Sequence, residues 1–280
     1  MTHISNLALG WLWLKGRLRL MTRTPRATFF TFVFPLILLV LLDSLGGGDV
    51  SVPGGKVAYA QYITPAIAIF ALTAGTYTSV IFGVATAREQ GIFKRVRGTP
   101  LPMPVFLGSW IAATVLAAFA AVALMFVVAV PAFGIDIRPE LLPAAVVTLA
   151  LGGLTLTALG FAVGSFIRRA DTAPIVANLT LFPLLFVSGV FYSIEGQPEW
   201  LQRIAEAFPL YHLVQAFTGC FSPYTTGSGF SGPDLWPLFA WGVVGTIVAV
   251  RRFSREATDE EGGASRPRPW RRALAGEARS

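Results

Sequence analysis

The chain has 280 residues, of which 54% are hydrophobic and only 13% are charged, and its mean hydropathy is +0.63. Soluble globular proteins carry roughly 25% charged residues, so this composition excludes an ordinary soluble domain and favours a membrane protein. We attribute the net charge of +7 to membrane topology, and we expect no nucleic acid among the partners.

The first predicted element is a helix over residues 4–20 that lies along the membrane surface. Apolar residues recur there at spacings of three and four, which places them on one helical face: Ile4, Leu7, Trp11, Leu14 and Leu18. Basic residues beside that face suit contact with lipid headgroups: Lys15, Arg17 and Arg19. We therefore predict a cytoplasmic interfacial helix within residues 1–26, the alternative being a basic flank of the first membrane span.

Six apolar stretches follow, each close to the length needed to cross a bilayer. A transmembrane helix needs about 20 mainly apolar residues, and a charged residue at mid-bilayer costs roughly 3 kcal/mol on insertion. Stretches with few or no charges predict spans over residues 27–45, 59–87, 104–133, 141–167, 172–194 and 234–252. The predicted fold is an all-α polytopic membrane protein with six transmembrane helices in residues 27–253.

Two features concern how these spans connect and pack. The outer loop over residues 43–56 contains runs of glycine and predicts a flexible connector. Small residues recur at every fourth position of the second span, from Ala71 to Ala87, and the fourth span carries Gly160 and Gly164. Such rows let helix backbones approach closely, so they predict a tight bundle.

The basic residues fall almost entirely on one side of the predicted spans. Of the 22 lysine and arginine residues, only Lys56, Arg138 and Arg203 lie on the other side. By the positive-inside rule both termini are cytoplasmic, and we expect a multi-pass protein of the cell (plasma or inner) membrane. We expect no cleavable signal peptide, and residues 254–280 predict a disordered, basic cytoplasmic tail.

The outer segment between the fifth and sixth spans predicts a short amphipathic helix at the membrane interface. Pro198 suits its first turn, and Pro209 ends it. Its apolar face would carry Trp200, Leu201, Ile204 and Phe208. A second apolar stretch over residues 211–217 predicts a re-entrant piece after it.

Few polar or chemically reactive groups lie within the spans. No phosphate-binding loop and no His-Glu-x-x-His motif occurs, so we predict no ATP site, no metal site and no cofactor on this chain. An integral membrane enzyme, for instance a hydrolase using Ser188 and His212, is one alternative. An ion-coupled secondary transporter is another, although it would need an ionisable residue deep within a span.

Aromatic and polar side chains inside the spans are candidates for lining a transport path. They are Phe30, Phe34, Thr76, Tyr77, Asn178 and Phe182. Packing against lipid is the alternative for each. Because none of them ionises readily, the energy for transport is expected to come from a partner.

The inner loop over residues 88–100 is the most informative stretch of the sequence. On a short helix its apolar residues Ile92, Phe93 and Val96 would share a face, surrounded by basic residues. Such an element can insert an apolar knob into a soluble partner. The alternative is an ordinary positively charged inner loop.

This loop resembles that of the permease family of type-2 ABC exporters, particularly the antibiotic-export branch typified by daunorubicin-resistance permeases. The family pattern Arg-Glu-x-Gly followed by Thr-Pro is matched by Arg88, Glu89, Gly91, Thr99 and Pro100. The usual threonine and acidic residue after that glycine are replaced by Ile92 and Lys94. Two further stretches are similar to family patterns, the Ser-Gly, aromatic-pair and Pro-x-x-Leu run over residues 188–201 and the Pro-Leu-x-His turn over residues 209–212.

The resemblance covers roughly residues 5–253 and implies a half-transporter. Two such six-helix subunits, identical or related, would form a path for a hydrophobic drug, antibiotic or lipid-like compound. Two ABC-type ATPase subunits from a separate gene would carry ATP and Mg²⁺. It implies that the loop is the main coupling element to the ATPase, with Glu89 the foremost candidate. The coupling residues that it implies are Arg88, Glu89, Gly91, Ile92, Phe93, Arg95, Thr99 and Pro100.

Overall fold

The computed structural model describes residues 6–22, 29–52, 54–192, 194 and 197–264. Of the predicted interfacial helix, Ile4 therefore lies outside the described residues, as do residues 265–280 of the predicted tail. The side chains of residues 6–8, 17, 20–22, 30, 31 and 254–264 also lie outside the description.

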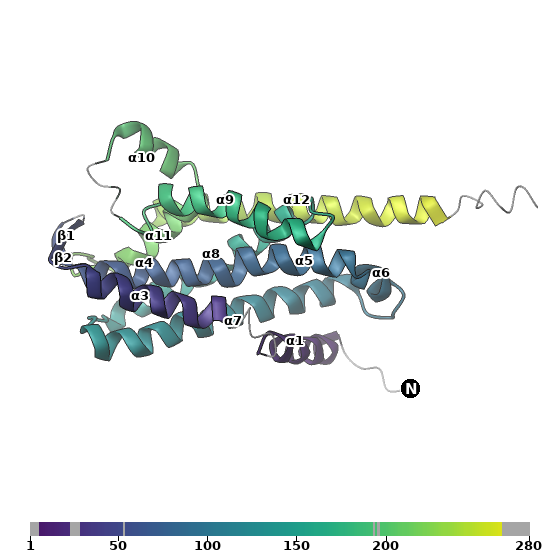
Figure 1. The fold of residues 1–280 in the computed structure, drawn as a ribbon, viewed down its shortest axis with the longest axis horizontal. Helices are drawn as coiled ribbons and strands as arrows, with labels where there is room; N and C mark the ends of the chain where they lie inside the picture. The colour runs from purple at the N-terminus through teal and green to yellow at the C-terminus, as the bar shows by residue number, and fades with distance from the viewer. Residues whose placement is uncertain (1–5, 23–28, 53, 193, 195–196, 265–280) are drawn as a thin grey trace, which may run out of the picture.

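The chain forms a bundle of long helices with short elements at both ends (Figure 1). In chain order the helices are α1 (Asn6–Thr22), η1 (Phe29–Val33), α3 (Phe34–Leu45), α4 (Tyr59–Thr73), η2 (Ala74–Thr78), α5 (Ser79–Glu89), α6 (Ile92–Arg97), α7 (Met103–Phe133), η3 (Pro139–Leu141), α8 (Leu142–Gly164), η4 (Ala170–Thr172), α9 (Ala173–Val187), α10 (Glu199–Glu206), α11 (Pro209–Gly219) and α12 (Gly232–Ala264).

The predicted all-α polytopic class is confirmed. Within the described residues, five helical stretches are long and apolar enough to cross a membrane: Tyr59–Glu89, Met103–Phe133, Pro139–Gly164, Ala170–Val187 and Gly232–Phe253. They correspond to the predicted second to sixth spans. The predicted first span is covered by η1 and the shorter apolar helix α3, so the count of six spans stays a prediction.

Two predicted boundaries differ from the structure by more than three residues. The fifth span ends at Val187, seven residues before the predicted 194, because the following Gly189 adopts a left-handed conformation (φ +78°) that ends a helix. The tail also begins later than predicted, since α12 continues to Ala264. Residues 254–264 include three Glu and two Ala, which extend an existing helix readily.

The outer loop that we predicted to be a flexible connector contains a β-hairpin. Strands β1 (Asp49–Val52) and β2 (Gly55–Ala58) pair antiparallel, with Val52 opposite Gly55. Gly54 in the connecting turn adopts a φ of +97°, which glycine tolerates without strain. The hydroxyl of Tyr224 donates a 2.9 Å hydrogen bond to the carbonyl oxygen of Lys56 and ties the hairpin to the bundle.

The second span, formed by α4, η2 and α5, lies at the centre of the bundle and is the most enclosed of the long helices. Helix α8 packs directly against it at the two predicted glycines. A Cβ atom at Gly160 would lie 2.9 Å from the carbonyl oxygen of Tyr77, and one at Gly164 would lie 3.1 Å from Cβ of Val84. The close approach predicted from these glycines is confirmed.

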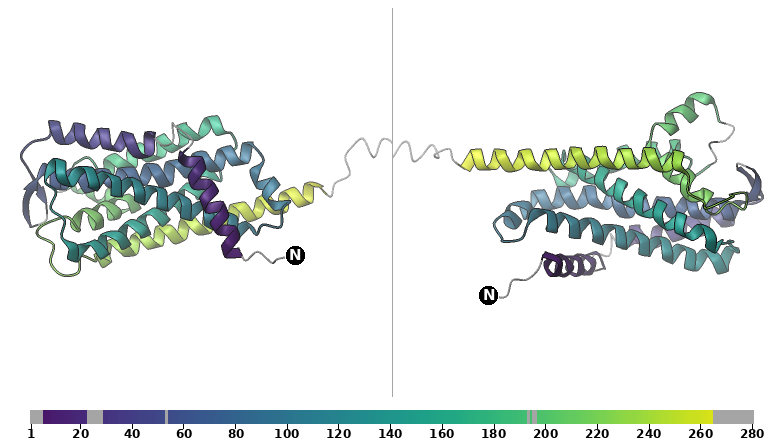
Figure 2. Two further views of the ribbon diagram at one scale, coloured as in Figure 1. Left: turned by 90° about the horizontal axis from the view of Figure 1, so that it is seen from below. Right: turned by 180° about the vertical axis from the view of Figure 1, so that it is seen from behind.

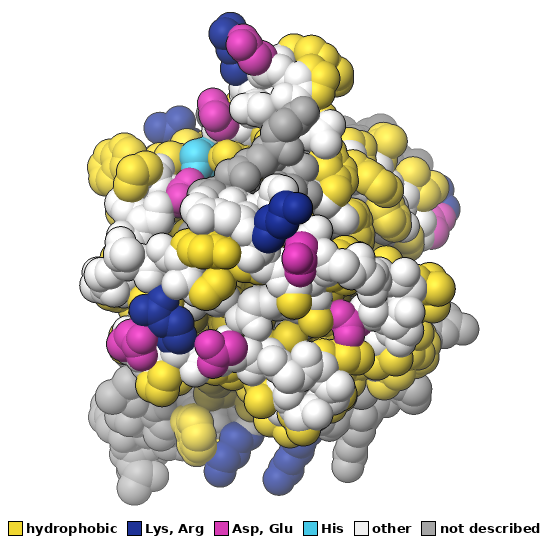
Figure 3. Space-filling view, turned by 90° about the vertical axis from the view of Figure 1, so that its left-hand side faces the viewer, with side chains coloured by type: hydrophobic (Ala, Val, Ile, Leu, Met, Phe, Trp, Pro, Cys, Tyr) yellow, Lys and Arg dark blue, Asp and Glu magenta, His cyan; other side chains and the backbone are white. Residues whose placement is uncertain are grey.

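The short elements divide between the two ends of the bundle. The hairpin, α10 and α11 lie at one end, while α6, α1 and the last turns of α12 lie towards the other (Figures 1 and 2). Helix α1 crosses the bundle axis (Figure 2), which is the orientation expected of a helix that lies along a membrane surface. Following the predicted topology, we name the α6 end inner and the hairpin end outer; Figure 3 looks onto the outer end, where basic side chains stand beside acidic ones.

Candidate functional site

The predicted inner loop folds as a tight turn followed by the short helix α6. Gly91 is the residue before this helix and adopts a left-handed conformation (φ +66°) that a residue with a side chain rarely takes. Its N–H donates a 3.0 Å hydrogen bond to the carbonyl oxygen of Arg88. The glycine therefore allows the chain to turn sharply between α5 and α6.

The apolar side of α6 faces the interior of this chain. Phe93 is only 6% exposed, and its ring lies 5.3 Å from that of Phe253 on α12 and 6.3 Å from that of Trp110 on α7. Val96 is buried in the same cluster, and Ile92 packs against it half-buried. We expected this face to be an apolar knob for a partner; instead, aromatic side chains of α7, α8 and α12 cover it.

The part of the inner loop that remains accessible is polar, and its α6 residues Lys94 and Arg95 are basic. Glu89, Lys94, Arg95, Thr99 and Pro100 are all exposed. Arg95 Nη2 donates to the carbonyl oxygen of Gln90 at 2.8 Å, and the hydroxyl of Thr99 donates to that of Val96 at 2.7 Å. Internal bonds therefore hold the shape of the loop and leave a polar surface at the inner end.

Two adjacent loop residues contact the connection between α8 and α9. Arg88 Nη1 donates hydrogen bonds to the carbonyl oxygens of Ser165 (2.7 Å) and Ile167 (2.8 Å). Glu89 Oε2 accepts a 3.2 Å hydrogen bond from the backbone N–H of Ala170. Each partner lies roughly 80 residues further along the chain than the side chain that contacts it, and no spacing in the sequence indicates these contacts.

Helix α1 lies against α7 next to this surface. The ring of Trp13 meets that of Phe106 edge-on at 5.3 Å, while Trp11 and Leu12 are exposed. Lys15 Nζ lies 5.0 Å from the centre of the Trp11 ring. An apolar edge and a basic side chain are therefore presented side by side at the inner end.

The candidate path residues separate into buried and exposed groups. Phe34 is half-buried and its ring lies 6.0 Å from that of Phe70, and Thr76 and Tyr77 are buried. Asn178 and Phe182 are exposed on α9. The side chain of Phe30 lies outside the described residues.

Helix α9 presents a broad exposed apolar surface around Asn178. Its exposed large side chains are Ile175, Leu179, Phe182 and Phe186. Where α9 meets the second span, the hydroxyl groups of Thr180 and of Tyr77 in η2 are hydrogen-bonded at 2.8 Å. A side-chain amide facing hydrocarbon is unfavourable, which distinguishes this face from an ordinary lipid-facing surface.

The predicted outer amphipathic helix is present as α10, preceded by Pro198 as its N-cap residue. Trp200, Ile204 and Phe208 are exposed on its apolar side, and Leu201 is half-buried. The predicted re-entrant stretch is the helix α11, which packs against α4, α8 and α12.

A histidine–aspartate pair that we did not predict joins α11 to α12. His212 Nδ1 lies 2.9 Å from Asp234 Oδ1, and His212 Nε2 lies 2.9 Å from the carbonyl oxygen of Glu206. Both ring nitrogens therefore have partners already, which disfavours the alternative of a serine hydrolase using Ser188 and His212.

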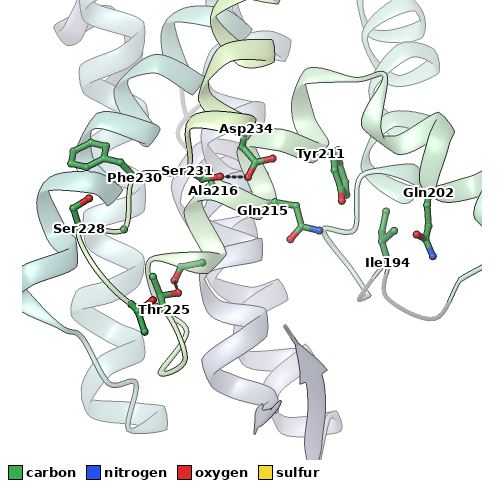
Figure 4. Close-up of a pocket in the computed structure, with 13 residues that line it drawn as sticks. Ile194, Gln202, Tyr211, Gln215, Ala216, Thr225, Ser228, Phe230, Ser231 and Asp234 are labelled. Carbon is green, nitrogen blue, oxygen red and sulfur yellow. Dashed lines mark hydrogen bonds between the residues drawn. The ribbon is translucent and has the colours of Figure 1, made fainter. Parts of the chain in front are cut away.

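Beside this pair lies an outer pocket of about 540 Å³, lined by residues from α10, α11, the loop that follows α11 and the start of α12 (Figure 4). Gln202, Tyr211, Gln215, Ser231 and Asp234 contribute polar groups to it. Among the residues that the structure describes, no group of three or more His, Cys, Asp or Glu side chains could hold a metal ion. The pocket suits water or a polar molecule.

Comparisons with known proteins agree with the sequence motifs. The profile of the ABC-2 type transporter family matches residues 9–221. The chain is 24% identical to the inner membrane transport permease YadH of Escherichia coli, over 78% of this chain and 84% of the relative. It is 27% identical to the daunorubicin resistance ABC transporter permease protein DrrB1 of Streptomyces coeruleorubidus, over 66% of this chain and 64% of the relative. The chain therefore belongs to the ABC-2 type transporter family, and it is the membrane-spanning permease subunit of an ABC exporter.

Proposed function

We propose that a separate ABC-type ATPase docks on the inner end of this permease and drives it. The observation that carries this proposal is the polar side of α6, which the aromatic cluster around Phe93 holds in place. Phe106 of this cluster also contacts Trp13 of α1. A rigid element with an exposed polar face suits transient contact with a soluble subunit. The arrangement requires both termini to be cytoplasmic.

Under this proposal ATP and Mg²⁺ bind to the partner, and this chain hydrolyses nothing. ATP binding changes the shape of the docked ATPase, which then favours a different permease conformation. Coupling of this kind requires only that the ATP-bound and ATP-free partners prefer different permease states.

The proposed substrate is a hydrophobic small molecule, and the proposed path runs between two copies of the permease or between this chain and a related one. The exposed face of α9 supports both parts, because it combines large apolar side chains with Asn178. A second protomer would give this amide a polar partner away from lipid. The daunorubicin-resistance relative supports the same substrate class.

The test uses inside-out membrane vesicles from cells that express the permease with its ATPase. Daunorubicin, added as a fluorescent hydrophobic probe, is expected to accumulate with ATP but not with a non-hydrolysable analogue. A protonophore is expected to leave this uptake unchanged. Uptake that needs no ATP and collapses with the protonophore would instead identify an ion-coupled transporter, and no uptake with the ATPase bound would contradict the substrate class.

A further inference from the structure

Arg88 and Glu89 reach the two sides of the loop that joins α8 to α9. Arg88 Nη1 donates to two carbonyl oxygens just beyond the C-terminal end of α8, at 2.7 and 2.8 Å. Glu89 accepts from the N–H of Ala170, the first residue of η4, which leads directly into α9. Neighbouring side chains at the end of α5 therefore hold both ends of one distant loop.

The charges of the two residues match the helix ends that they contact. The C-terminal end of a helix carries partial negative charge on its unpaired carbonyl groups, and the N-terminal end carries partial positive charge on its unpaired N–H groups. Arg88 is cationic at the C-terminal end of α8, and Glu89 is anionic at the N-terminal side of η4 and α9. Exchanging the two residues would oppose both helix ends without changing the net charge.

A second contact joins the same elements deeper in the bundle. The hydroxyl groups of Tyr77 in η2 and Thr180 in α9 are hydrogen-bonded at 2.8 Å. The second span is thus linked to α9 at two levels, while the opposite face of α9 stays exposed. A displacement of the inner loop would pull on α9 through the contact of Glu89.

We propose that Arg88 and Glu89 are positioning residues that transmit movement of the inner loop to α9. In this role the carboxylate of Glu89 acts within the chain, as a hydrogen-bond acceptor, and is not a docking charge for the ATPase. The proposal rests on the proposed function, because the movement originates in the docked ATPase.

The test compares three variants in the complete complex of permease and ATPase. Glu89→Ala removes the acceptor, and Glu89→Gln keeps an acceptor oxygen but removes the charge. Ala170→Pro removes only the donor N–H and leaves Glu89 intact. Proline suits this position, because Ala170 begins a helix and the preceding Arg169 is extended (φ −122°, ψ 137°), as a residue before proline prefers. Gln90→Ala, at an exposed neighbour, is the matched control.

The readouts are the ATPase recovered with the permease, the substrate transported per ATP hydrolysed, and the thermal stability of the permease. We expect Glu89→Ala and Ala170→Pro to lower transport per ATP by about tenfold, with wild-type recovery of the ATPase, since each removes the same charge-assisted bond. Gln90→Ala is expected to stay close to wild type. Glu89→Gln keeps the acceptor oxygen but loses the charge, so it is expected to fall between wild type and Glu89→Ala. A loss of stability alone would lower total transport without changing the transport per ATP.

The proposal is overturned if Glu89→Gln is as defective as Glu89→Ala and loses the ATPase while Ala170→Pro behaves as wild type. That result would make Glu89 a docking charge. If Ala170→Pro fails to give a monodisperse protein, the contrast between the two Glu89 variants decides alone. Absence of any ATPase with the wild-type permease would instead refute the proposed function, so the two failures are distinguishable.

Discussion

At the residue scale, single glycines set how closely the central helices approach. Gly160 lies where α8 crosses η2 and α5, and an added Cβ there would be 2.9 Å from a backbone oxygen and 3.1 Å from Cβ of Val80. Neither neighbour is the flexible end of a long side chain. Gly108 on α7 is different, because an added Cβ would meet nothing within 4 Å.

These two glycines give a matched prediction. Gly160→Ala should destabilise the protein by about 1–3 kcal/mol through overpacking, and thermal unfolding in detergent, followed by tryptophan fluorescence, measures it. Gly108→Ala makes the same chemical change in open space and should be neutral or slightly stabilising. Equal effects of both substitutions would contradict the close packing of α8 on the second span.

Cys220, the single cysteine of the chain, gives a second residue-level prediction. Burial raises the pKa of its thiol to about 11, so only roughly one thiol in ten thousand is the reactive thiolate at neutral pH. Alkylation by N-ethylmaleimide should be slow and should accelerate with rising pH up to that pKa. Ser228→Cys in a Cys220→Ser background, at an exposed loop position, should react fast. Equal rates at neutral pH would show that Cys220 is accessible.

At the element scale, the inner end is organised by an aromatic cluster drawn from four separate helices. Phe93 of α6 packs among Phe106 and Trp110 of α7 and Phe253 of α12, and Phe161 of α8 meets Trp110 at 5.4 Å. The cluster fixes α6 to the membrane helices, so a force on the exposed side of α6 is passed to them rather than absorbed by a loose loop.

Truncating the central ring should loosen α6. Phe93→Ala should destabilise the protein by about 3 kcal/mol, because it leaves a cavity among large rings, and the fluorescence of the adjacent Trp110 should shift on unfolding at a lower temperature. Lys94→Ala, exposed on the same helix, should leave the unfolding temperature unchanged. The opposite order of effects would mean that Phe93 is not buried within the chain and faces a partner, as the sequence alone suggested.

The elements show what the sequence could and could not predict. Charge-free stretches and the positions of Pro198 and Gly160 predict spans, a short outer helix and close packing, because these depend on local composition and spacing. The partner of Glu89 lies 81 positions away and the pair of His212 lies 22 away, and one chain carries no periodic signal for such contacts. The inward direction of Phe93 was missed because helical periodicity gives a face but not what covers it.

At the scale of the whole molecule, the exposed face of α9 is where we propose that a second permease packs. Phe182→Cys in a Cys220→Ser background should form disulfide-linked dimers in membranes treated with a mild oxidant, because the proposed two-fold path brings both copies of α9 together. Val127→Cys, at a strongly exposed apolar position on α7, is the control and should stay monomeric. Cross-linking at Val127 and none at Phe182 would place the dimer interface elsewhere.

Co-purification tests whether an ABC-type ATPase docks on this permease. The permease is tagged at its C-terminus, solubilised in mild detergent and purified, and the proteins bound to it are identified and assayed for ATP hydrolysis. We predict one ATPase subunit for each permease and hydrolysis that the proposed hydrophobic substrate stimulates. A permease that is recovered alone, under conditions that preserve a known ABC exporter complex, would contradict it.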